Sequence, residues 1–362
     1  MPERAIVREK GQESEQRGTP ASARQKKAFA RRPGRDYSQA VRCCVQVLFV
    51  LLNLWIGVEF YLFVRHYETA GQTPFQPRPA GVEGWLPIAS LMNLKYLLFT
   101  GSFPPVHPAG LVLFLAFIGI SLLWSKSFCS WLCPVGTLSE ALWKLGKKIF
   151  RRNLVLPRWL DWPLRSLKYV LLGLFFLAVG SMPVRALEAF LQSPYGLIAD
   201  VKMLNFFRQL SLTSILVLGV LALASLFIQN FWCRYLCPYG AFLSIPAWLS
   251  RGKIRRNSES CIDCAKCAQA CPSLLPVDKL KVVRSVECTS CLECVAVCPV
   301  QDTLQMSLPG RKAVPEWVVA AGIVVLFLGI VGIAKWTGHW DSSVPDLLYF
   351  QLIPQAHLFQ HP

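Results

Sequence analysis

Charged side chains are scarce in this sequence. Only 16% of the 362 residues are Asp, Glu, Lys or Arg, whereas 53% are hydrophobic. An ordinary soluble domain carries about 25% charged residues. The composition therefore argues against a soluble globular protein and predicts an integral membrane protein.

Several familiar functional motifs are also missing. The sequence has no P-loop, no glycine-rich dinucleotide fingerprint, no C-x2-C-H haem attachment site and no evident flavin-binding segment. No cleavable signal peptide is visible, because the first 40 residues are polar and basic and are longer than a signal n-region. These absences leave the cysteines as the candidates for chemistry.

Acidic residues are the rarer of the charged kinds, with 21 Asp and Glu against 38 Lys and Arg and a net charge of +17. Such a charge can indicate nucleic-acid binding, but membrane proteins also collect Lys and Arg on their cytoplasmic side. The sequence has five apolar runs long enough to span a bilayer: 41–64, 107–126, 167–185, 210–230 and 315–335. A membrane topology accounts for the excess of basic residues, so nucleic-acid binding is not expected.

The distribution of basic residues sets the expected orientation. Eleven lie in 1–42, nine in 126–168 and eleven in 231–315, all on one side if the chain crosses five times from a cytoplasmic N-terminus. A sixth crossing at 86–103 would move a basic loop outside, so we expect that segment to be re-entrant or interfacial. We also expect residues 156–165 to form a separate helix on the cytoplasmic surface.

The expected fold is an all-α membrane protein of about five helices, with a small α+β two-cluster ferredoxin-like domain before the last helix. Its expected parts are a disordered basic cytoplasmic tail (1–40), a membrane domain (41–256), a cytoplasmic ferredoxin-like domain (257–308), a last span (315–335) and a periplasmic tail (336–362). The expected location is a bacterial inner membrane.

Eight of the 14 cysteines form two combs with the spacing C-x2-C-x2-C-x3-C-P, at 261–272 and 288–299. In two-cluster ferredoxins, the fourth cysteine of each comb ligates the other [4Fe–4S] cluster. One cluster is therefore expected at Cys261, Cys264, Cys267 and Cys298. The other is expected at Cys288, Cys291, Cys294 and Cys271. Zinc prefers separated C-x2-C pairs and fits this spacing poorly.

Four more cysteines belong to an internal repeat with an offset of 104 residues. Segment 121–153 aligns without gaps to 225–257, and 11 of 33 positions are identical. The repeat places Cys129-x3-Cys133-Pro and Cys233-x3-Cys237-Pro at the expected cytoplasmic ends of two spans. If helical, each pair would share one helix face, and a pseudo-twofold axis would bring the four thiols together. They could bind a third iron–sulfur cluster or copper(I), cycle as dithiols, or only pack.

The remaining candidate residues are possible quinone ligands and two cysteines without a partner motif. Oxidation of a quinol releases protons, so polar residues near the outer face are candidate quinone ligands. They are Glu59, His66, Glu68, His107, Glu188, Asp200 and Lys202. Each could equally be an interfacial anchor or a helix cap. Cys43 and Cys44 have no partner motif, and ordinary packing is expected for them.

Taken together, the paired CxxxCP motifs, the tandem ferredoxin combs and the last span resemble the membrane-bound polyferredoxins. One branch is similar over nearly the whole chain after the first 35 residues, including GVEGWLPIASLMNLKY (81–96), FCSWLCPVGTLSE (128–140) and WCRYLCPYGA (232–241). The family includes quinol-dehydrogenase subunits, so the resemblance implies electron transfer between the quinone pool and another redox partner. A related branch is associated with copper reduction.

The sequence thus leaves three functions open. The first is an electron carrier or quinol-dehydrogenase subunit with two [4Fe–4S] clusters and a third centre. The second is a copper-binding protein that reduces the metal with ferredoxin electrons, and the third is a redox sensor. Its partners would be lipid, quinone and an unidentified redox protein.

Overall fold

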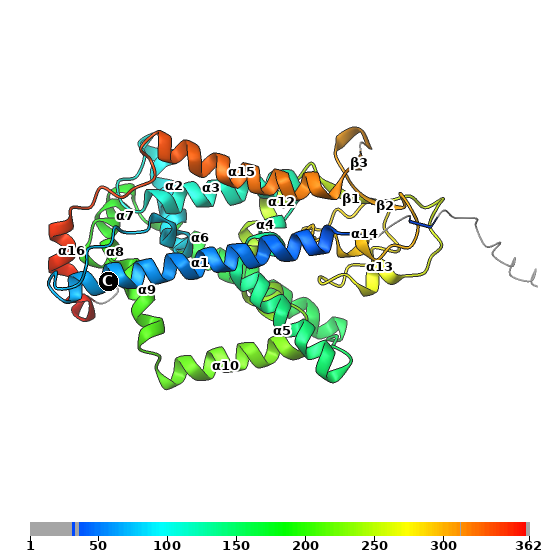
Figure 1. Ribbon diagram of the computed structural model, residues 1–362, viewed down its shortest axis with the longest axis horizontal. Coiled ribbons are helices and arrows are strands. Elements are labelled where there is room, and N and C mark those ends of the chain that lie inside the picture. The colour runs from blue at the N-terminus through cyan, green and yellow to red at the C-terminus, as the bar shows by residue number, and fades with distance from the viewer. Residues whose placement is uncertain (1–30, 33–35, 312, 360–362) are drawn as a thin grey trace, which may run out of the picture.

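Long apolar helices make up most of the chain in the computed structural model, which describes residues 31–32, 36–311 and 313–359. Residues 1–30 of the predicted N-terminal tail lie outside the described part. Helices α1, α3 and α15 run along the long axis, with the ferredoxin combs at one end and α7, α8 and α16 at the other (Figure 1).

The helices and strands follow one another in this order. They are α1 (Ser38–Glu68), η1 (Ala80–Trp85), α2 (Pro87–Thr100), α3 (Pro108–Trp124), α4 (Ser127–Trp131), α5 (Pro134–Phe150), α6 (Arg158–Ser181), α7 (Val184–Leu191), α8 (Pro194–Leu197), α9 (Ala199–Arg208), α10 (Leu212–Phe227), η2 (Trp232–Leu236), α11 (Pro238–Phe242), α12 (Ser244–Trp248), β1 (Lys253–Arg256), α13 (Lys266–Gln269), α14 (Glu293–Ala296), β2 (Leu304–Ser307), η3 (Pro309–Arg311), β3 (Ala313–Val314), α15 (Glu316–Trp336), α16 (Asp346–Leu352) and η4 (Ala356–Leu358).

Three helices in the described part are long and apolar enough to cross a membrane: α1, α6 and α15. A fourth crossing would be the pair α9 and α10, which meet at a bend of 83°. Helix α3 is apolar but has only 17 residues. The membrane-spanning character is thus confirmed, whereas the count of five crossings stays a prediction.

The expected surface helix at 156–165 does not exist as a separate element. Helix α6 runs without interruption from Arg158 to Ser181 and contains Pro163. A proline removes one helical hydrogen bond, but Pro163 lies in the first two turns, and the apolar sequence that follows continues the helix. The surface segment and the predicted span are therefore one element.

A small antiparallel sheet closes the ferredoxin region. Strand β1 pairs with β2 in the register Lys253 to Ser307 through Arg256 to Leu304, and β2 pairs with β3. Because β1 precedes residue 257, the sheet begins before the predicted domain boundary. The two combs, with the short helices α13 and α14, lie between β1 and β2 in the sequence.

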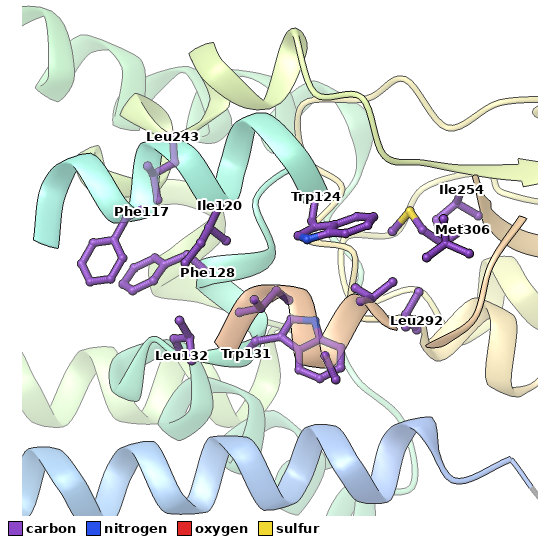
Figure 2. Close-up of a cluster of buried hydrophobic side chains, with 14 of the residues drawn as sticks. Phe117, Ile120, Trp124, Phe128, Trp131, Leu132, Leu243, Ile254, Leu292 and Met306 are labelled. Atoms are coloured by element: carbon purple, nitrogen blue, oxygen red, sulfur yellow. The ribbon is translucent and has the colours of Figure 1, made fainter. Parts of the chain in front are cut away.

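One hydrophobic core joins the helices to the ferredoxin region. Phe117, Ile120 and Trp124 of α3 continue through Phe128 and Trp131 of α4 to Ile254, Leu292 and Met306 (Figure 2). Side chains in such a core are closely packed and transmit displacements. The ferredoxin region is therefore held in a fixed position against α3 and α4.

Candidate metal centres

The two combs fold into matching loops. In each, a pair of residues between the first three cysteines has positive φ: Asp263 and Ala265 in the first comb, Ser290 and Leu292 in the second. Alternation of left- and right-handed residues curls the backbone into a nest that suits negatively charged groups. The third cysteine then lies in a four-residue helix, Cys267 in α13 and Cys294 in α14.

The comb cysteines line two separate cavities. One, of about 350 Å³, is lined by Cys261, Cys264, Cys267 and Cys298. The other, of about 360 Å³, is lined by Cys271, Cys288, Cys291 and Cys294. We call them the distal and the proximal cavity. Each contains three cysteines of one comb and the fourth of the other, which is the sharing expected for two-cluster ferredoxins.

The chemistry of the proximal cavity fits a metal cluster. Burial raises the pKa of the Cys291 thiol to about 12, because a thiolate is costly in an apolar environment. Four ionised sulfurs can share this cavity only with compensating positive charge, which the iron atoms of a cluster supply. The residues present therefore fit an iron–sulfur cluster.

The CxxxCP motifs do not form continuous helices as expected. Cys129 lies in α4 and Cys233 in η2, but Cys133 and Cys237 are the N-cap residues of the next helices, with ψ of 117° and 106°. A proline follows each cap and occupies the first helical position, where its missing N–H is tolerated. The chain therefore turns between the two cysteines of each pair.

The second cysteine of each motif caps a helix with its sulfur. Cys133 Sγ accepts a hydrogen bond from Gly136 N at 3.4 Å, and Cys237 Sγ accepts one from Gly240 N at 3.3 Å. The N-terminal end of a helix carries partial positive charge, which stabilises a thiolate. Burial raises the pKa of both thiols, and these hydrogen bonds from backbone N–H groups partly offset that rise.

A third and larger cavity contains all four CxxxCP cysteines. It has about 680 Å³ of empty volume, and its lining includes Cys129, Cys133, Cys233 and Cys237. We call it the membrane-end cavity. Pro272, Ser273 and Thr289 line both this cavity and the proximal one. The repeat thus brings the two motifs together, and they lie next to the proximal comb.

Two buried lysines hold the proximal comb at this position. Lys168 Nζ lies 2.7 and 2.8 Å from the two carboxylate oxygens of Glu287, and Lys126 Nζ lies 3.1 Å from one of them. Burial alone would raise the pKa of Glu287, but the charges of the two ammonium groups lower it to about 2. Glu287 directly precedes Cys288, so this ion-pair cluster fixes a comb residue.

Helix α4 also bonds directly to the proximal comb. Ser130 Oγ donates to Thr289 O at 2.6 Å, and Trp131 Nε1 donates to Ser290 O at 3.1 Å. These bonds join the element that carries Cys129 to the loop that carries the proximal cysteines. Helix α4 and this loop therefore cannot move relative to each other unless these hydrogen bonds break.

The candidate quinone ligands do not form one site. His107 and Asp200 meet through Arg78, whose Nη2 lies 3.3 Å from His107 Nδ1 and 2.7 Å from Asp200 Oδ2. Arg78 Nη1 also donates to the fully buried Glu83 at 2.7 Å. Sequence reasoning missed Arg78 and Glu83, because Arg78 precedes the short helix η1 and Glu83 lies within it, where six residues are too few to show a periodic pattern.

The other outer-face candidates have separate surroundings. His66 Nδ1 lies 2.6 Å from Thr73 O, and Glu68 pairs with Arg208 at 2.7 Å. Glu59, Glu188 and Lys202 are half-buried on α1, α7 and α9. Cys43 and Cys44 are exposed on α1 and line none of the three cavities, so they do not pack inside the protein.

Membrane-length helices joined to cysteine-lined cavities define a membrane-spanning iron–sulfur protein. The family described as "4Fe-4S binding domain" matches residues 106–153 and 210–257, which confirms the internal repeat. The family described as "4Fe-4S dicluster domain" matches residues 253–299.

Similar proteins indicate which membrane-spanning iron–sulfur proteins this chain is related to. "Putative electron transport protein YccM" of Escherichia coli (strain K12) is 50% identical over 91% of this chain and 94% of its own length. "Regulatory protein NosR" of Pseudomonas aeruginosa is 33% identical over 52% of this chain and 26% of its own. "Methylamine utilization ferredoxin-type protein MauN" of Methylobacillus flagellatus is 30% identical over 44% and 54%. No solved structure matches.

The chain belongs to the YccM family of membrane-bound polyferredoxins. It is an iron–sulfur electron transport protein with relatives in membrane redox systems.

Proposed function

We propose that the chain carries electrons between the membrane quinone pool and a further redox protein, through clusters held by twelve cysteines. Two [4Fe–4S] clusters occupy the distal and proximal cavities, and a third iron–sulfur centre occupies the membrane-end cavity. The observation that supports this most directly is that each of the three cavities is lined by four cysteines. A bound cluster supplies a one-electron redox site.

Charge balance supports a cluster at Cys129, Cys133, Cys233 and Cys237. Lys126, Arg165 and Arg234 line the membrane-end cavity together with Glu287, and Lys168 and Asp161 pair with these groups. Four cations against two carboxylates leave two positive charges. An oxidised iron–sulfur cluster with four thiolates is a dianion, which these charges neutralise.

Copper is the second candidate at this cavity, because soft thiolates bind copper(I). A mononuclear ion needs its ligands to converge on one point. Within the part of the chain that the structure describes, no group of three or more Cys, His, Asp or Glu side chains is placed to hold a single metal ion. Four thiols that line one cavity without converging on one point favour a cluster over a single copper ion.

Metal analysis of the anaerobically purified chain separates these proposals. We expect about twelve irons per chain without copper if each of the three cavities holds a four-iron cluster. Stoichiometric copper that is lost in Cys133→Ser and Cys237→Ser would favour copper handling. A titration with decylubiquinol followed by EPR tests the quinone link, which fails if every centre stays oxidised.

The proposed orientation has the N-terminus and the combs in the cytoplasm of a bacterium and α16 in the periplasm. It is supported by the basic residues, 31 of 38 of which lie on the side of the combs if the chain crosses five times. Alkaline phosphatase fused after residue 362 should be active, because that enzyme folds only outside the cytoplasm. An inactive, stable fusion contradicts this orientation.

A further inference from the structure

The membrane-end cavity is larger than the proximal cavity. Its volume of about 680 Å³ is roughly twice that of the proximal cavity, at about 360 Å³. Each of the two cavities is lined by four cysteines. The excess volume therefore extends beyond the space around the thiols.

Two arginines that share one carboxylate line the cavity. Arg234 Nη2 lies 3.0 Å from Asp161 Oδ1, and Arg165 Nη2 lies 2.7 Å from Asp161 Oδ2. Tyr235 Oη also donates to Asp161 Oδ1, at 2.6 Å. Asp161 is thus fully engaged, and it fixes both guanidinium groups in position.

Donors on these arginines remain without an acceptor. Nε and Nη1 of Arg234 and Nε of Arg165 are buried and have no hydrogen-bond partner among the described residues. Arg234 is 8% exposed. A buried donor without a partner is costly, so these three N–H groups indicate a ligand that supplies acceptor oxygens.

Aromatic residues supply the apolar part of the lining. Phe128, Trp232 and Tyr239 line the same cavity as Arg234. A planar ring with carbonyl oxygens would fill this space, stack on aromatic faces and accept from the guanidinium groups. Because the cluster dianion already balances the local charge, a neutral ligand suits the site better than a phosphate.

We infer that the guanidinium side of the membrane-end cavity binds the head group of a quinone, with Arg234 and Arg165 donating to a ring carbonyl. This inference rests on the proposed quinone link and gives it a location. The head group shares its cavity with Cys129, Cys133, Cys233 and Cys237. It therefore lies beside a redox centre.

The ion-pair network around Arg78, which includes His107 and Asp200, is a less suitable site for the quinone head group. His107 precedes the 17-residue helix α3, and Cys129 lies just beyond its other end. Such a helix is about 25 Å long. Electron transfer slows steeply with distance, and the acidic groups near His107 are already paired with Arg78. The network is therefore structural.

Decylubiquinone binding to the full chain in detergent, measured by calorimetry, tests this location. We expect Arg234→Gln to weaken binding about ten-fold or more, because it removes donors to a buried acceptor. Arg165→Gln should weaken it less, since only one free donor is lost. Iron content after purification is measured alongside, because both arginines also contribute positive charge around the membrane-end cavity, and binding is compared between preparations that retain their iron.

Two further variants separate binding from folding. Arg234→Lys keeps the positive charge beside Asp161 but lacks the planar fork, so it should preserve iron content and still bind decylubiquinone weakly. Arg251→Gln is the matched control, because Arg251 is exposed and outside the cavity lining. Its binding should equal that of the native chain.

The outcomes distinguish the site from the quinone link itself. If decylubiquinol reduces the centres of the native chain and of Arg234→Gln at equal rates, the link stands and this location is wrong. If decylubiquinone binds as expected but decylubiquinol reduces none of the centres, the proposed link to the quinone pool is wrong. Loss of a tightly bound phospholipid from Arg234→Gln, with unchanged quinone binding, would identify a lipid site and overturn the inference.

Discussion

Two glycines occupy equivalent positions in the CxxxCP repeat, and their surroundings differ. A Cβ added to Gly136 would lie 2.2 Å from Cys129 O, whereas one added to Gly240 would meet nothing closer than 3.7 Å. The turn between Cys129 and Cys133 therefore requires glycine at position 136. The corresponding turn in the second motif has room for a methyl group.

We therefore expect Gly136→Ala to displace Cys129 from Cys133 and to remove the membrane-end centre. The variant should lose the iron of that centre and keep the iron of the two combs, because the backbone must move to relieve the contact. Gly240→Ala is the matched control and should keep all iron. Equal iron in the two variants would show that the turn does not position the cysteines.

At the scale of residues, the sequence predicts which cysteines line the cavities. It does not predict the ion pairs that hold those cysteines in place. The spacing identified all twelve cavity cysteines, because ligand spacing is local in the sequence. Lys168 and Glu287 are 119 positions apart, and no periodicity links them. Their pairing depends on the packing of α6 against the combs, which only the structure supplies.

At the scale of elements, an ion-pair cluster joins α6 and the turn between α3 and α4 to the proximal comb. Lys168 is fully buried and pairs with Glu287 beside Cys288. Replacing Lys168 with Gln removes one positive charge near the proximal and membrane-end cavities. Reduction adds an electron to an already negative cluster, so the loss of a nearby cation makes reduction harder.

We expect Lys168→Gln to lower the reduction potential of the nearest centre by about 60 mV, which corresponds to about 1.4 kcal/mol for one electron. An EPR-monitored redox titration measures this shift. Lys148→Gln is the control, because Lys148 is exposed at the far part of α5. Equal potentials in the two variants would mean that Lys168 acts only in packing.

A second ion-pair cluster joins α1, α5 and α14. Arg42 donates to both carboxylate oxygens of Glu140, at 2.8 and 2.6 Å, and to Glu293 at 2.9 Å. Its side chain is 3% exposed. Burial alone would raise the pKa of Glu140, but its hydrogen bonds to Arg42 and the charge of Arg42 lower it to about 2.

Glu140→Gln should therefore lower stability by about 2 kcal/mol, because a buried arginine loses one of its two partners. The folded pKa of Glu140 lies below the unfolded value of about 4.3. Its contribution is thus complete above about pH 4.3 and is lost as the pH falls towards 2. The difference in Tm between the native chain and Glu140→Gln should be the same at pH 7 and pH 5.5. A difference that shrinks at pH 5.5 would contradict the assigned ion pair.

Elements were predicted where hydrophobic length alone determines them. The runs at 41–64 and 315–335 correspond to α1 and α15. Length could not predict the break between α4 and α5, because a spacing of four residues fits a helix as well as a turn. The bend between α9 and α10 likewise depends on tertiary packing.

At the scale of the whole molecule, the three cavities follow one another from the helices outwards. The membrane-end and proximal cavities share Pro272, Ser273 and Thr289. Helix α14 joins the proximal cavity to the distal one, because Cys294 lines the former and Cys298 the latter. Cys264 of the distal cavity is exposed. This order predicts that electrons from a quinol reach the distal cluster only through the proximal one.

A matched pair of cysteine variants tests this order. Cys291→Ser removes the proximal cluster, so dithionite should reduce the distal cluster while decylubiquinol does so far more slowly than in the native chain. Cys264→Ser removes the distal cluster instead, and decylubiquinol should reduce the proximal cluster at the native rate, because that step lies upstream. Rapid-freeze EPR after anaerobic mixing measures both rates. If decylubiquinol reduces the distal cluster of Cys291→Ser at the native rate, the clusters are not in series, and the exposed Cys264 end is an entry point for electrons instead of their exit.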